Sequence, residues 1–147
     1  MLDTIVGAAV EAASQTGPDF TVSRPAQSAT ARRAARVPRG WEAFARCVEH
    51  RESRGQSDNV NPSSGAAGLF QFMPAWRGSL PYVISERLGQ FGMAAKQRAK
   101  VRTYLFRVHY IHKYPAVYQR IAFAEVLDDG LWVHWYLAGS RCNGMAQ

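Results

Sequence analysis

A glutamate stands at the far end of an apolar helix face in the first half of the chain. Trp41, Phe44 and Val48 recur at helical spacing, and at about 100° per residue Glu52 points within about 20° of Trp41. Glu49 lies about 80° from that direction, on the flank of the helix. A carboxyl group on an apolar face is poorly solvated, so its pKa rises and it can stay protonated near neutral pH. A general acid for glycosidic bond cleavage requires such a carboxyl group.

Residues that could contact a sugar follow Glu52 in the sequence. Residues 56–68 are rich in Gly, Asn, Ser and Pro and predict turns, where backbone groups can approach a substrate closely. Gln71 could hydrogen-bond to an amide such as an N-acetyl group. Flat aromatic faces suited to stacking on sugars are offered by Phe70, Phe72, Trp76, Trp135 and Tyr136.

The same residue types also have a purely structural interpretation. A glutamate at a helix end is usually salt-bridged, and Arg51 or Arg54 could pair with Glu52. Aromatic residues at helical spacing usually belong to the core. Periodicity alone leaves both interpretations open.

The surrounding pattern predicts a mainly helical domain. The first helix starts near Trp41 and is stopped by Gly55. The remaining expected elements are a short extended piece at 69–72, a helical turn at 73–81, one or two helices over 84–115, a helix over 116–130, and an aromatic-rich segment over 131–140.

The length of 147 residues fits a single domain with a tail. Residues 1–39 carry scattered prolines, small residues and a run of arginines, so we expect a flexible or extended N-terminal arm before a folded domain at 40–147. The first residues lack the basic start and long apolar run of a secretory signal. No stretch approaches the roughly 18 apolar residues of a transmembrane helix.

The net charge of +7 suits a polyanionic partner such as nucleic acid, an anionic membrane or an acidic cell-wall polymer. The arginine-rich arm and the basic stretch at 96–113 contain no recognisable motif for reading bases. Any binding to nucleic acid would therefore be non-specific and salt-dependent, and no specific nucleic-acid partner is expected.

The two cysteines, Cys47 and Cys142, lie far apart and have neither CxxC spacing nor clustered histidines. A metal site is therefore not expected, and nothing indicates a cofactor. The residues alone leave open whether the cysteines are buried thiols or a disulfide.

The segment ESRGQSDNVNPSSGAAGLFQFMPAW, residues 52–76, resembles the signature of the lytic transglycosylase family related to soluble lytic transglycosylase and goose-type lysozyme. The matching parts are the Glu52–Ser53 pair, the Gly-Leu-Phe-Gln stretch at 68–71 and the Met-Pro pair at 73–74. Residues 135–139 echo a third element, Ala-Tyr-Asn-Ala-Gly. Two positions depart from the family pattern: Phe70 replaces a Met, and Leu137 replaces an Asn, which puts one binding contact in doubt.

The resemblance implies an α+β lysozyme-like fold with a Gly-rich loop or short hairpin and a sugar-binding groove. It makes Glu52 the single catalytic acid/base. It also implies substrate contacts for Ser53, Gln71, Phe72 and Tyr136, with Tyr136 near the acid.

The chain is also similar to resuscitation-promoting factors of actinobacteria, over about residues 40–142. In those proteins a Cys precedes the catalytic Glu, and a late Trp-containing segment ends in its partner Cys. This likeness implies a disulfide between Cys47 and Cys142.

The implied activity is cleavage of the β-1,4 bond between N-acetylmuramic acid and N-acetylglucosamine in peptidoglycan glycan strands. One Glu suffices when the substrate's own 6-hydroxyl attacks the anomeric carbon and leaves a 1,6-anhydro sugar. Asp58 is the nearest following acid, so lysozyme-type hydrolysis is the alternative. An inactive lysozyme-like plug of a phage tail is another.

The expected location follows from the missing export signal. A wall-cleaving enzyme must reach its substrate, so we expect delivery in a phage virion or action outside the cell at the wall. Residues 1–39 would then attach to other virion or tail proteins.

Overall fold

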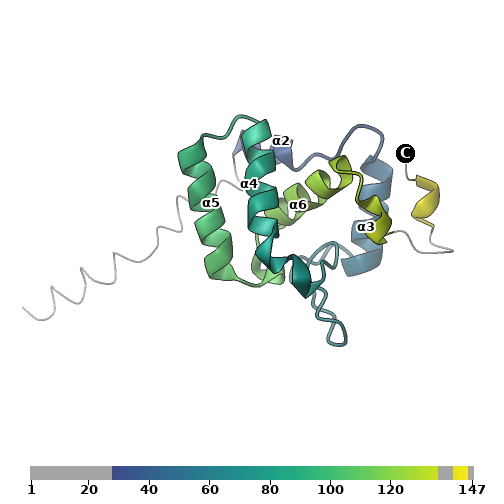
Figure 1. The fold of residues 1–147 in the computed structure, drawn as a ribbon. Coiled ribbons are helices and arrows are strands. Elements are labelled where there is room, and N and C mark those ends of the chain that lie inside the picture. The colour runs from purple at the N-terminus through teal and green to yellow at the C-terminus, as the bar shows by residue number, and fades with distance from the viewer. Residues whose placement is uncertain (1–27, 136–140, 146–147) are drawn as a thin grey trace, which may run out of the picture.

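The computed structural model describes residues 28–135 and 141–145 (Figure 1). The helices are α2 (Ala29–Ala34), α3 (Glu42–Ser53), α4 (Leu80–Gln90), α5 (Ala95–Val108) and α6 (Ala116–Asp128), with short 3-10 turns η2 (Pro74–Gly78), η3 (Ile111–Lys113), η4 (Trp132–Trp135) and η5 (Asn143–Met145). Within those ranges extended pairing is limited to two isolated antiparallel bridges, which join Val60 to Ala67 and Ala67 to Phe72. The mainly α class expected from the sequence is confirmed.

Helix α6 forms the centre of the described core. Residues 121–127 are buried without interruption, so this stretch of the helix is covered on every side. Helices α4 and α5 lie side by side, and α2 and α4 pack against α6 (Figure 1). The expected helices over 84–115 and 116–130 are present as α4, α5 and α6.

Helix α3 carries the expected apolar stripe and ends where the sequence predicts. Phe44 and Val48 are buried, whereas Trp41 is half-buried. The helix stops at Ser53 because Arg54 and then Gly55 adopt left-handed backbone conformations, with φ of 53° and 78°. A disulfide between Cys47 and Cys142 ties this helix to the C-terminal segment, with 5.6 Å between the two Cα atoms.

The expected boundary between arm and domain at residues 39 and 40 is wrong for residues 28–39. Helix α2 places Ala31 and Ala34 in the core with no exposed surface. The buried guanidinium of Arg87 donates to the carbonyl oxygens of Ala34 at 2.6 Å and Arg36 at 2.8 Å. The same group pairs with buried Glu125 at 2.9 Å. Small apolar residues and carbonyl groups therefore anchor this segment, although its composition is that of a tail. Residues 1–27 lie outside the described part of the chain.

The expected extended piece at 69–72 is instead a turn. Ala67 and Phe72 exchange two backbone hydrogen bonds of 3.0 Å, and residues 68–71 form the turn between them. Gly68 and Gln71 both adopt positive φ values, 84° and 53°. This compact turn follows the polar loop after the helix that carries Glu52.

None of the described helices has the length and apolar character needed to cross a bilayer.

Candidate active site

Glu52 lies in the last turn of α3 and is half-buried. Burial raises the pKa of its carboxyl group above the ordinary value, and the positive charge of neighbouring Arg51 partly opposes this effect. Within residues 28–135 and 141–145, the carboxylate makes no hydrogen bond or ion pair. The pairing with Arg51 or Arg54 that a structural role would require is therefore not formed in this part of the chain.

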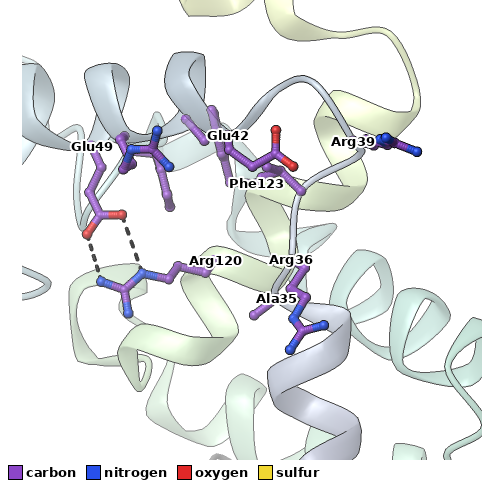
Figure 2. A pocket seen from close by; sticks show the side chains of 11 residues that line it. Ala35, Arg36, Arg39, Glu42, Glu49, Arg120 and Phe123 are labelled. Atoms are coloured by element: carbon purple, nitrogen blue, oxygen red, sulfur yellow. Dashed lines mark hydrogen bonds and ion pairs between the residues drawn. The ribbon is translucent and has the colours of Figure 1, made fainter.

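The neighbouring acid, Glu49, is held in an ion pair. The guanidinium of Arg120 on α6 reaches across to it, with Nη2 at 2.7 Å from Oε1 and Nε at 3.4 Å from Oε2 (Figure 2). The Glu49 carboxylate is therefore occupied by Arg120, and both of its oxygens already accept hydrogen bonds. Of the two acids in this helix turn, Glu52 is the one suited to proton transfer.

Asn59 links the polar loop to the end of α3 through hydrogen bonds. Its side-chain amide donates to the carbonyl oxygen of Glu52 at 3.4 Å. Its own carbonyl oxygen accepts from the backbone N–H of Gly68 at 2.8 Å and from Nε2 of Gln71 at 3.2 Å. Gln71 also donates to the carbonyl oxygen of Gly68 at 3.0 Å. These bonds bring Gln71, 19 positions away in sequence, to the helix end that carries Glu52.

Gln119 on α6 holds the same turn from the core side. Its Oε1 accepts from the backbone N–H of Leu69 at 2.7 Å, and its Nε2 donates to the carbonyl oxygens of Ser57 and Tyr114 at 3.0 and 2.8 Å. A Cβ atom on Gly68 would collide with this side-chain amide. Glycine is therefore required at position 68 both for its φ and for the close approach of Gln119.

Two residues that were expected to touch substrate are structural. Ser53 is 3% exposed; its hydroxyl donates to the carbonyl oxygen of Glu49 and accepts from the N–H of Gly55, so it helps to end the helix. Phe72 is 1% exposed and packs edge-on against Trp76 and Trp135. The expectation that either one binds a sugar is wrong for this conformation, because neither side chain reaches the surface.

The other aromatic candidates are mostly core residues as well. Phe70 is buried and stacks on Phe123 with 3.9 Å between ring centroids. Trp135 is also buried, and its indole N–H donates to the Phe70 carbonyl oxygen at 2.7 Å. Trp76 is half-buried. Tyr136 lies outside the described residues.

Gln71 is half-buried, and both hydrogen bonds recorded for its side chain use Nε2. Its Oε1 is therefore the atom that could accept a hydrogen bond from a substrate amide.

Asp58, the nearest following acid, is exposed in the turn at residues 57–58.

Sequence reasoning did not identify the roles of Asn59, Gln119 and Arg120. Asn59 was visible only as one of many turn-forming residues. Gln119 carried a clearer signal, since it is a polar side chain within the most apolar of the described helices and is only 1% exposed. A buried polar residue must find partners, which is how Gln119 comes to organise the turn.

Two cavities lie along the flank of α3 that carries Glu49. The first has a volume of about 400 Å³, an apolar floor and a charged rim; its lining includes Val37, Ala45, Phe123, Arg36, Arg39 and Glu42. The second has a volume of about 390 Å³ and includes His50, Arg54 and Gly55. Arg46, Glu49 and Arg120 line both, so the cavities adjoin at the Glu49–Arg120 pair. We call the two together the arginine groove.

Glu52 does not line the arginine groove. The arginine groove and the half-buried acid Glu52 thus lie on different flanks of this helix. We place the chemistry at Glu52 because burial raises the pKa of its carboxyl group, whereas the Glu49 carboxylate is occupied by its ion pair with Arg120. Among the described residues, no group of three or more His, Cys, Asp or Glu side chains is arranged to hold a metal ion.

Comparisons with protein-family models, with curated proteins and with solved structures find no match to this chain.

Proposed function

We propose that this protein is a peptidoglycan-cleaving lytic transglycosylase with Glu52 as its single acid/base. The observation that carries the proposal is the state of Glu52: half-buried, raised in pKa and unpaired among the described residues, while Glu49 one turn earlier is neutralised. The hydrogen bonds of Asn59 add support, since they link the turn that carries Gln71 to the end of the helix that carries the acid.

The chemistry needs only one carboxyl group. Protonated Glu52 gives its proton to the glycosidic oxygen as the bond to C1 of N-acetylmuramic acid breaks. The resulting carboxylate then takes the proton of the 6-hydroxyl while that oxygen forms a bond to C1. The products are a 1,6-anhydro-N-acetylmuramic acid end and a free 4-hydroxyl on N-acetylglucosamine, with no water consumed. The nucleophile belongs to the same sugar, so its approach requires no second positioned group.

Lysozyme-type hydrolysis would require a further group to position water or form a covalent intermediate. Asp58 is the nearest acid in sequence, and its exposure in a turn does not favour that role. The α+β lysozyme-like arrangement and a sugar-binding groove at Glu52 are part of the proposal.

We further propose that the protein acts on the wall from a phage virion or from outside the cell. The disulfide suits an oxidising compartment, which supports this location. Attachment to other virion or tail proteins is assigned to residues 1–27, because residues 28–39 are used by the fold.

A cleavage assay on purified, peptide-free glycan strands tests the proposal. Glu52→Gln keeps the shape of the side chain but removes its transferable proton, so cleavage should fall at least a hundredfold with the unfolding midpoint preserved. Glu49→Gln, one turn away, should retain most of the activity. A Glu52→Gln variant that kept more than a few per cent of the original cleavage rate would refute the proposal.

A further inference from the structure

The arginine groove carries a strong excess of positive charge. Arg36, Arg39, Arg46, Arg54 and Arg120 line it, against the two acids Glu42 and Glu49. Arg120 is paired with Glu49, and the Glu42 carboxylate accepts from the N–H of Gly40 at 2.8 Å. Within the described ranges, the other four guanidinium groups make no hydrogen bond or ion pair recorded in the structure. A groove with this charge fits an anionic ligand.

The kind of anion follows from the donors and the floor. Guanidinium groups bind carboxylates through two parallel N–H donors. The floor is apolar, with Val37, Ala45 and Phe123 among its residues. A ligand that fits both features carries carboxylates spaced by small apolar groups. Figure 2 shows the layout of the first cavity, with the Glu49–Arg120 pair at one end and Arg36, Arg39 and Glu42 towards the other.

The length and position of the groove indicate an extended ligand. The groove follows α3 from Glu42 to Arg54, about 18 Å at 1.5 Å per residue. An extended peptide of five residues spans up to about 17 Å. Arg54 and Gly55, at one end of the groove, lie two and three positions after Glu52 in the chain. A glycan strand reacting at Glu52 would therefore bring a peptide attached to it to the mouth of the groove.

We propose that the arginine groove binds the carboxylate-bearing stem peptide attached to N-acetylmuramic acid. The choice of ligand rests on the proposed function, whereas the cationic, partly apolar character of the site does not. The groove holds the peptide while the sugar to which it is attached lies at Glu52, so peptide-substituted strands bind more tightly than bare ones. The Glu49–Arg120 pair lies where the two cavities meet, so a peptide that occupies both cavities must pass over this pair.

Isothermal titration of the full chain with a synthetic pentapeptide, Ala–γ-Glu–Lys–Ala–Ala with D-residues at the second, fourth and fifth positions, tests this directly. The matched probe is the same peptide with every carboxylate converted to a carboxamide. Amidation should weaken binding at least tenfold. Equal binding of the two peptides overturns the proposal. Tighter binding of a single-stranded trinucleotide, whose two phosphates match the two carboxylates of the peptide in number, also overturns it, because it would mark a general polyanion site.

A pair of variants locates the binding. Arg36→Gln combined with Arg46→Gln should weaken binding of the acidic peptide at least tenfold, whereas Arg107→Gln, an exposed arginine on α5, should change it less than twofold. Equal effects of the two changes would overturn the assignment. If the double variant unfolds, the comparison of the acidic and amidated peptides on the unaltered protein still tests whether the groove binds carboxylates. Peptide binding without any strand cleavage would overturn the proposed function alone, and cleavage without peptide binding would overturn the groove assignment alone.

Discussion

Arg120 on α6 holds Glu49 on α3 in a two-point ion pair, whereas Glu52, about one helical turn later, makes no ion pair among the described residues. The Arg120 side chain is 45% exposed, so solvent screens the attraction and its contribution to stability is small. A double-mutant cycle with Glu49→Gln and Arg120→Gln should give a coupling free energy below about 1 kcal/mol in urea unfolding. A coupling above about 2 kcal/mol would mean that the pair is a structural fastening between α3 and α6.

The raised pKa of Glu52 should appear in the pH dependence of both activity and stability. The folded protein binds this proton more tightly than the unfolded chain does. The resulting stabilisation is complete below the ordinary carboxyl pKa and is lost as the pH rises through the raised value. The cleavage rate should fall over the same range, because the reaction starts from protonated Glu52. Glu52→Gln should remove this component from the stability profile.

Arg51 provides a directional test of that assignment. Its charge lowers the pKa of Glu52, so Arg51→Gln should move the alkaline limb of the rate profile to higher pH. Arg51→Lys keeps the charge and should leave the limb near its original position. A shift to lower pH in the glutamine variant would show that the limb belongs to another group.

Gly68 and Gly55 form a matched pair for testing the turn. Both have positive φ, 84° and 78°, but only at Gly68 would a Cβ meet another group, the amide of Gln119. Gly55→Ala should cost about 1 kcal/mol from backbone strain alone. Gly68→Ala should cost at least about 1 kcal/mol more and lower cleavage, since the turn that carries Gln71 must move. Urea unfolding measures both losses in the free energy of unfolding. Equal losses would show that Gln119 does not restrict position 68.

Truncation should show where the fold begins. Removing residues 1–27 should leave cleavage by the remaining chain largely unchanged. Removing residues 1–39 also deletes α2 and the carbonyl groups that satisfy buried Arg87, which should destabilise the domain by several kcal/mol. Thermal unfolding of the two shortened chains separates the outcomes, and similar midpoints would contradict the role given to α2.

The helices were the most predictable part of this structure, because local signals define them. The apolar stripe of α3 and the stop at Gly55 depend on residues within one segment. The same holds for α6, whose long apolar run is visible in the sequence. Helix α2 was missed because its burial depends on Arg87, more than fifty positions later.

In the candidate site, the position of Glu52 was predictable, but the roles of the residues around it were not. The direction of Glu52 and the rise in its pKa followed from helix geometry. The roles of Ser53 and Phe72 did not, because a serine can cap a helix as readily as it contacts a sugar, and an aromatic ring that could stack on a sugar can equally fill a core. Packing between Phe72 and Trp135, 63 positions apart, decided the second case.

The masses of the products released from purified peptidoglycan test the central claim most directly. Transglycosylation by Glu52 predicts fragments that end in 1,6-anhydro-N-acetylmuramic acid, with no added water, and none released by Glu52→Gln. Hydrolysis adds the mass of one water for each bond cut. Products dominated by water addition, and lost in Asp58→Asn, would contradict the account and make the protein a lysozyme-type hydrolase.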